Sequence, residues 1–173
     1  MGKLEVTAEE IGYPEQESWL SKWDDVTRDY EAAEETLTTE GTDNRVIRHR
    51  LLRFFEDCWH LAEWIKNDTE VPAAVAQKVV KEAWAAEPMK LCEAVANTSK
   101  HHTRRADKAT ARVMAVKFPQ GSGTWAPTVT IKIWQPGIAE PQEHDGRTLA
   151  AECMAWWRGF IKQNGLPVPW DEN

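Results

Sequence analysis

The sequence contains no long apolar segment. No run approaches the roughly 18 consecutive apolar residues that a membrane-spanning helix needs, and the amino-terminal residues MGKLEVTAEE lack the apolar core of a secretion signal. We therefore expect no membrane association and a cytoplasmic location. A glycine-rich phosphate loop and the Gly-x-Ser-x-Gly turn of a hydrolase are also missing from the sequence, which removes two common classes of enzyme.

Cysteine is scarce, and its spacing does not suggest a metal site. The three cysteines are Cys58, Cys92 and Cys153, and no two of them form a Cys-x-x-Cys pair. Each lies among apolar residues with helical spacing, which is typical of buried free thiols rather than of disulfides. Neither His-x-x-x-His nor His-Glu-x-x-His occurs. We therefore predict buried thiols, no bound metal and no cofactor.

Tyrosine is rare as well, with two residues against ten tryptophans in a chain of 173. Tryptophan anchors both cores and interfaces, because it buries a large area and retains one polar donor. Apolar residues make up 42% of the chain and charged residues 28%, which is the balance of a globular protein with one core. We expect a single domain over residues 1–173. The abundance of tryptophan further predicts a homodimer or an interface with another protein.

Negative charge is concentrated at the start of the chain. Residues 1–43 hold 13 acidic and 3 basic residues, and the net charge of the whole chain is −7. The remainder is therefore slightly basic, with two distinctly cationic segments. Residues 44–55 contain four arginines and no acid, and residues 100–117 contain six cations and one aspartate. Local basic surfaces are expected on an otherwise acidic protein.

Helical periodicity dominates the chain. Apolar residues step by three and four through residues 19–37 and again through residues 47–65, which places them on one stripe of each helix. Pro72 and Pro88 suit the first turns of two further helices. Residues 110–135 instead alternate with a period of two around the turn PQGSG, which predicts a β-hairpin.

The expected fold is mainly α, an antiparallel helical bundle with one β-hairpin between the fourth and the last helices. Its expected parts are an acidic amino-terminal helical segment over 1–43, core helices over 44–106, the β-hairpin over 110–135 and a carboxy-terminal helix over 145–164.

The segment LCEAVANTSKHHTRRADK contains the first candidate site. Glu93, Asn97 and His101 are four residues apart and share one face of a helix. An imidazole titrates near neutrality, so His101 can act as a general acid or base with Asn97 beside it. A solvated helix end, whose cations complement the helix dipole, explains the same residues without a function. The cations that would bind an anionic phosphate are Lys100, Arg104 and Arg105.

The second helix offers another set of polar residues. Arg53, Glu56, His60 and Trp64 share a face of this helix. His60 is a candidate for proton transfer, and Arg53 is a candidate phosphate ligand. The alternative is a packing histidine that is hydrogen-bonded to Asp57 or Glu56.

Two motifs carry a resemblance to known proteins. FFEDCWHLAEWIKND and LCEAVANTSKHH resemble a group of small prokaryotic and phage proteins of unassigned function, over residues 44–102. More distantly, the arrangement resembles HEPN domains, which are helical bundles that act as ribonucleases in toxin and antiphage systems. Their motif is Arg, four to six residues and His, often with Asn directly after the Arg. Asn97 and His101 match it, whereas Ala96 stands in the place of the Arg.

The sequence leaves two functions open. The HEPN resemblance implies a metal-independent ribonuclease, or a degenerate relative that binds RNA, in a toxin or phage–host conflict. Arg53 and His60 also satisfy the loose spacing of the motif. The alternative is a non-enzymatic interaction module, in which the Trp-rich helices and the edge of the hairpin bind a protein partner.

Overall fold

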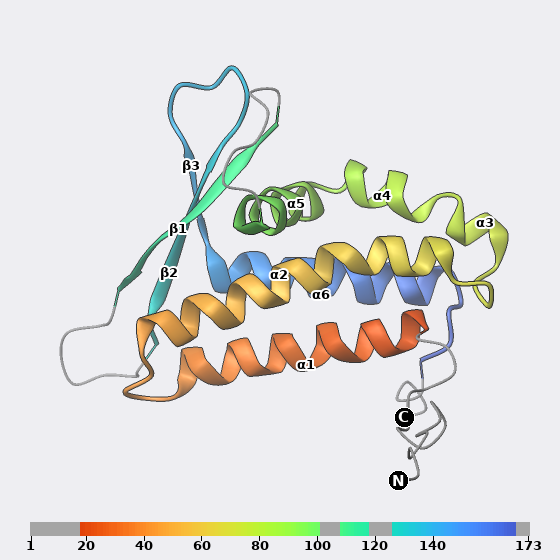
Figure 1. Ribbon diagram of the computed structural model, residues 1–173, viewed down its shortest axis with the longest axis horizontal. Coiled ribbons are helices and arrows are strands. Elements are labelled where there is room, and N and C mark those ends of the chain that lie inside the picture. Colours follow the sequence, from red (N-terminus) through yellow and green to blue (C-terminus); the bar gives the residue numbers. More distant parts are fainter. Residues whose placement is uncertain (1–17, 101–107, 118–125, 169–173) are drawn as a thin grey trace, which may run out of the picture.

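The computed structural model describes residues 18–100, 108–117 and 126–168. The protein is mainly helical and carries a small three-stranded antiparallel sheet at one end of its long helices (Figure 1). The expected fold class is thus confirmed at the level of helices plus a hairpin.

The long helices are α1 (Trp19–Thr38), α2 (Asn44–Asn67) and α6 (Gly146–Gln163), which run along the length of the molecule (Figure 1). α5 (Glu87–Lys100) crosses them so steeply that it is seen nearly end-on in the same view. The bundle is therefore not uniformly antiparallel, because one of its four main helices lies across the other three.

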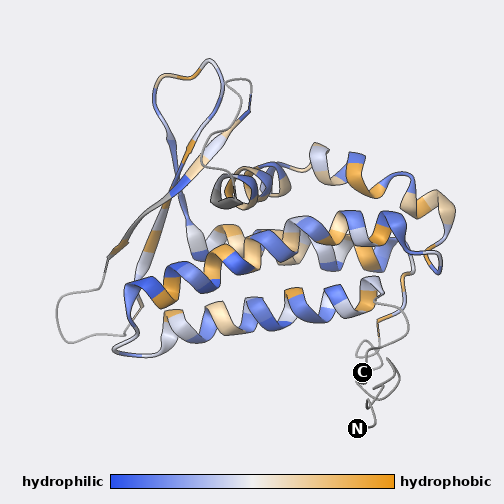
Figure 2. Cartoon of the chain, in the orientation of Figure 1, coloured by the Kyte–Doolittle hydropathy of each residue, from blue (hydrophilic) through white to orange (hydrophobic). Residues whose placement is uncertain are grey.

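Local signals set the boundaries of α1 and α2. The Ser18 side chain caps α1, and the Asp43 carboxylate caps α2 by accepting a hydrogen bond from the Arg45 N–H at 2.7 Å. Gly41 has a φ of 82°, which favours glycine and allows the chain to reverse between the helices. Apolar residues recur along both helices among hydrophilic ones (Figure 2), and the apolar stripes pack against each other and the core.

The segment after α2 differs from the single helix expected from Pro72. It forms two short helices, α3 (Ala73–Ala76) and α4 (Val79–Ala85). The break falls where the Lys78 N–H bonds to the Val75 carbonyl at 3.1 Å, a tighter turn than that of an α-helix. Pro88 lies in the first turn of α5 as predicted.

The sheet confirms the hairpin and adds a third strand. β1 (Thr110–Lys117) pairs antiparallel with β2 (Thr128–Trp134), with an irregularity between Val113 and Ala115. β3 (Gln142–Asp145) pairs with the other edge of β2, in a segment between the expected hairpin and the expected carboxy-terminal helix. Its sequence QEHD contains no β-branched or aromatic residue, so hydrogen bonding to β2 rather than intrinsic propensity makes it a strand.

The core lies where α2, α5 and α6 meet and extends to the inner face of the sheet. Val129, Ile131 and Ile133 alternate inward from β2 and are fully buried. Trp157 of α6 is also fully buried, and its indole Nε1 donates a hydrogen bond to the Cys58 carbonyl of α2 at 3.0 Å. Of the described tryptophans, Trp19, Trp23 and Trp157 are buried in the core. The expected homodimer stays a prediction.

The environment of α5 corrects one expectation. Leu91–Ala96 are buried all round the helix, and Glu93 is only 5% exposed. The sequence placed Glu93 on a polar face shared with Asn97, but at Glu93 this face is enclosed by the protein rather than solvated. The reason is tertiary, because α5 is enclosed by α2 and α6 together with the first two strands.

Replacing Trp157 with Phe tests the contact between α2 and α6. We expect Trp157→Phe to lower the free energy of unfolding by about 2 kcal/mol, since it removes a buried hydrogen bond and leaves a cavity. Urea denaturation measures this change. Trp84→Phe is the control, because Trp84 is 41% exposed, and it should cost less than about 1 kcal/mol. Equal losses in the two variants would contradict the assigned role of Trp157.

Candidate functional site

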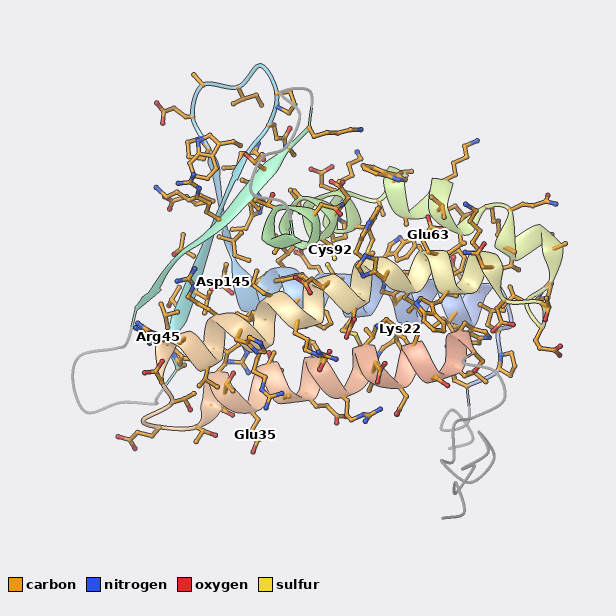
Figure 3. All side chains as sticks on the ribbon, viewed as in Figure 1. Lys22, Glu35, Arg45, Glu63, Cys92 and Asp145 are labelled. Carbon is orange, nitrogen blue, oxygen red and sulfur yellow. The ribbon has the colours of Figure 1, made fainter. Side chains whose placement is uncertain are left out.

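A cluster of charged side chains joins α1 to α2. Lys22 Nζ lies 2.6 Å from Asp57 Oδ1, and Arg53 Nε lies 3.2 Å from Asp29 Oδ2. Lys22 projects from α1 toward α2 in Figure 3. The Asp29 and Asp57 side chains are 14% and 13% exposed, whereas that of Arg53 is 57% exposed. The cluster thus combines two nearly buried carboxyl groups with a guanidinium that reaches solvent.

The two carboxyl groups share a proton. Burial raises the pKa of Asp29, and its hydrogen bond to Asp57 and the charge of Asp57 raise it further, to about 6. Burial also acts to raise the pKa of Asp57, but hydrogen bonds from Asp29 and Lys22 outweigh burial and lower that pKa. Asp57 Oδ2 is buried and makes no hydrogen bond to an N–H group of the described residues, although Arg53 Nη2 lies 3.7 Å away. Below about pH 6 a protonated Asp29 supplies the hydrogen bond that this oxygen needs.

The cluster continues along α2 toward His60. Asp57 follows Arg53 by four residues and precedes His60 by three, so the three side chains lie on one face of the helix. His60 is half-buried. Sequence analysis selected Arg53 and His60 on this spacing, but it could not supply Asp29 and Lys22, because the contacts between α1 and α2 join residues far apart in the chain.

A second polar pair lies on α5. Asn97 Nδ2 donates a hydrogen bond to Glu93 Oε1 at 2.8 Å, and Asn97 is half-buried. The predicted common face of these residues is therefore real, although it is enclosed rather than solvated. Ala96, which occupies the place of the HEPN arginine, is 1% exposed. A guanidinium at that position would have to be accommodated inside the core.

Several predicted site residues lie outside what the structure describes. His101, Arg104 and Arg105 fall between residues 100 and 108, and the side chain of Lys100 is likewise not described. Their proposed roles in proton transfer and phosphate binding rest on the sequence alone.

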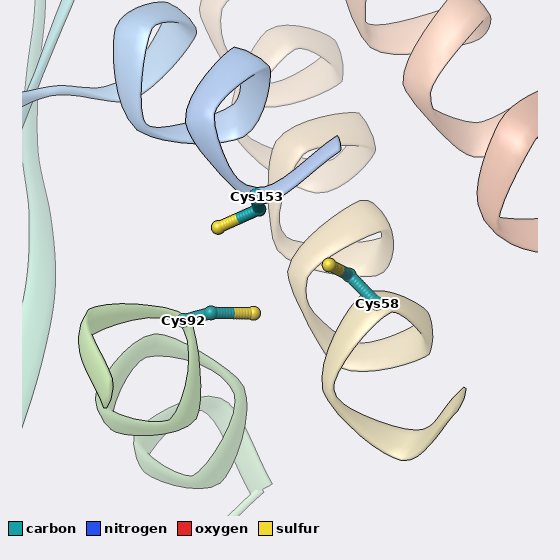
Figure 4. Close-up of side chains that lie close together, drawn as sticks. All are labelled: Cys58, Cys92 and Cys153. Carbon is teal, nitrogen blue, oxygen red and sulfur yellow. The ribbon is translucent and has the colours of Figure 1, made fainter. Parts of the chain in front are cut away.

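The residues best placed to hold a metal are the three cysteines. Cys58 of α2, Cys92 of α5 and Cys153 of α6 point toward one another (Figure 4), and their sulfur atoms all lie within 4.8 Å of one another. All three are free and buried, as predicted. Their convergence was not predicted, because sequence separations of 34 and 61 residues give no sign that three helices will meet at these positions.

The thiols influence one another's ionisation. Burial raises the pKa of Cys92 and of Cys153 well above the ordinary value. Burial acts in the same direction on Cys58, but hydrogen bonds from Cys153, Cys92 and Trp157 outweigh it and lower the pKa of Cys58 to about 5. Cys58 is therefore the sulfur that carries negative charge first.

Comparisons with protein-family models, curated proteins and solved structures gave no match to this chain. The resemblances carried by the two sequence motifs therefore stay predictions. Within the described residues, no helix combines the length and the apolar character required to cross a bilayer.

The raised pKa of Asp29 predicts the pH dependence of stability. The native state holds this proton up to about pH 6, whereas the unfolded chain releases it near 3.8. The resulting stabilisation is complete below pH 3.8 and is lost as the pH rises through 6. Relative to Asp29→Asn, which cannot titrate, the wild-type protein should lose about 1–2 kcal/mol of unfolding free energy over this range, after allowance for partial exposure.

Urea denaturation at a series of pH values measures this difference. Asp24→Asn, at an exposed position of α1 paired with Arg28, is the control and should not change the pH dependence. Parallel stability curves for the wild type and Asp29→Asn would rule out a shared proton.

Proposed function

We propose that the protein binds RNA through the arginine-rich first two turns of α2, as a HEPN-like helical protein, and that it cleaves the bound RNA without a metal. The observation that carries the proposal is a run of exposed arginines with no carboxylate partner among the described residues. Arg45, Arg48 and Arg50 lie in the first two turns of α2 and are all exposed. Arg45 lies at the end of the molecule that carries the sheet (Figure 3).

These arginines differ from most other cations of the described chain. No ion pair joins the side chain of Arg45, Arg48 or Arg50 to another described residue. The cations that do form ion pairs are Lys22, Arg28, Arg53, Lys66, Lys78, Lys90, Lys132 and Arg147. A guanidinium that is not neutralised within the protein can bind phosphate in a bidentate manner, with little competition from neighbouring acids.

Arg53 follows Arg50 by three residues on α2 and lies near groups that can transfer protons. It is more than half exposed and contacts Asp29, whose pKa is about 6. His60 lies two turns further along the same face. Transfer of a phosphoryl group without a metal needs a cation on the phosphate and groups that titrate near neutrality. Arg53 and His60 supply both types of group on one face of α2, with Asp29 of α1 beside Arg53.

The cleavage step is assigned to His101, with Asn97 and the cations Lys100, Arg104 and Arg105 beside it, on the resemblance of the motif. Ala96 removes the motif's own arginine. An arginine from the α2 row is the replacement that we propose for the phosphate contact, because lysine lacks the planar fork of a guanidinium.

One observation favours the alternative of a protein-interaction module. Trp84 is 41% exposed and packs edge-on against Trp59, with ring centroids 5.1 Å apart. It borders a cavity of about 280 Å³ whose lining also includes Lys108, Ile133 and Pro136. An exposed tryptophan beside a cavity of mixed polarity is suited to an interface.

The RNA-binding proposal is tested by the salt dependence of affinity. Arg48→Ala should weaken binding of single-stranded RNA and lower the slope of log affinity against log salt by about 0.7, the contribution of one phosphate contact. Lys81→Ala is the matched control, because it removes an exposed cation from α4 and should leave the slope unchanged. Fluorescence anisotropy over a series of salt concentrations measures both. Equal effects of the two substitutions would show that binding is not localised on α2.

The cleavage step has its own test. His101→Ala should lower the rate of RNA cleavage by about 10² to 10⁴, the usual contribution of a general acid or base, with RNA affinity retained. Gel analysis of a labelled RNA under single-turnover conditions measures the rate. RNA binding without cleavage by the wild-type protein would reduce the proposal to a binding function. The absence of both activities at low salt would favour the interaction surface around Trp84.

A further inference from the structure

The three cysteines form a cluster that the RNA-binding proposal does not use. They come from three different helices and meet in the core, where the residues of Cys58, Cys92 and Cys153 are each 0% exposed. Two of the sulfurs also lie near backbone carbonyls, Cys92 Sγ at 3.4 Å from the Phe55 oxygen and Cys153 Sγ at 3.4 Å from the Pro88 oxygen. Two of the three thiols therefore have a hydrogen-bond acceptor inside the core.

The geometry is suited to three-coordinate binding. At a sulfur-to-ion distance of about 2.3 Å, three sulfurs arranged around one ion lie about 4 Å apart or slightly closer. The sulfurs of this cluster are all within 4.8 Å of one another, so small side-chain rotations bring them to that spacing. The group contains no histidine and no carboxylate within the described residues.

The number and type of ligands exclude most ions. Structural zinc sites almost always have four ligands, and this cluster offers three. Calcium and magnesium require oxygen ligands. Thiolates select soft ions. The cluster therefore suits a soft ion that prefers three ligands.

The net charge of the ion and its three thiolates excludes further ions. Three thiolates around Cu⁺ leave two negative charges, and around Zn²⁺ they leave one. The carboxylate of Asp57 acts on Cys58 and that of Glu152 acts on Cys153, and both oppose further negative charge. Burying an uncompensated charge is costly. The ion must therefore form a neutral complex with three thiolates, which requires a charge of three.

We propose that Cys58, Cys92 and Cys153 form a three-coordinate binding site for a soft trivalent ion, with trivalent arsenic, supplied as arsenite, as its ligand. Arsenite is an uncharged molecule, As(OH)₃, at neutral pH, so it carries no charge into the core. Three As–S bonds replace three As–O bonds, each hydroxyl group leaves as water with one proton from the cysteines or solvent, and no electrons are transferred. The site does not depend on RNA binding.

The three As–S bonds form inside the core. As each bond forms, the thiol proton leaves with the departing hydroxyl group as water. Because the sulfurs are buried, we expect binding to require local opening of the core and therefore to be slow.

Native mass spectrometry and equilibrium competition of the full chain with arsenite under reducing conditions test the proposal. We expect one arsenic per chain and the loss of three reactive thiols. Cys92→Ala and Cys153→Ala should each weaken binding by about 100-fold or more, beyond the roughly 10 to 100-fold typical of removing an outer-shell partner. Ile65→Val is the control, because it removes a methylene group from a fully buried residue of α2 that is not part of the cysteine cluster. This variant should retain wild-type affinity for arsenite. Circular dichroism identifies any variant that does not fold.

Zn²⁺ and Cu⁺ serve as competing probes. If neither Zn²⁺ nor Cu⁺ displaces arsenite, the result supports the neutral three-thiolate complex. Tight, cysteine-dependent binding of Zn²⁺ or Cu⁺ without binding of arsenite would overturn the assignment. Arsenite affinity that is unchanged in both cysteine variants would likewise show that the arsenic binds elsewhere.

Discussion

The buried face of α2 supports most of the other helices. Its apolar residues are all 2% exposed or less and run the length of the helix as Ile47, Leu51, Phe54, Phe55, Cys58, Leu61, Ala62 and Ile65. α1, α5 and α6 pack on α2, and Trp157 of α6 is hydrogen-bonded to its backbone. Because hydrophobic stabilisation scales with the apolar area removed from water, this helix contributes to nearly every interface of the core.

The charged cluster between α1 and α2 costs folding free energy, which the apolar packing offsets. Moving Asp29 and Asp57 out of water is costly, and their ion pairs with Arg53 and Lys22 recover only part of that cost. The shared proton reduces the cost, because it removes one of two negative charges from a confined space. The same arrangement leaves the Arg53 guanidinium at the surface, where it can bind an anion.

Two chemically distinct sites thus lie on different faces of one helix. Asp57 faces the charges of α1, and its neighbour Cys58 faces the thiols of α5 and α6. Consecutive residues of an α-helix differ by about 100° in direction, which is enough to separate the ionic cluster from the sulfur cluster. The carboxylate of Asp57 still opposes negative charge on Cys58. The negative charge of Asp57 is one reason why we expect the sulfur cluster to favour a neutral complex.

The sequence by itself determined the features that depend on neighbours along the chain. The spacing of apolar residues predicted α1, α2 and α6, Pro88 marked the start of a helix, and alternation predicted the pairing of β1 with β2. Only the tertiary structure decided the strand β3 and the burial of residues 91–96 of α5, since each depends on contacts with distant segments. The same holds for the sites. Arg53, His60 and Asn97 could be selected from helical spacing, whereas the partners Asp29 and Lys22 and the meeting of Cys58, Cys92 and Cys153 could not, because hydrophobic packing between helices sets their positions.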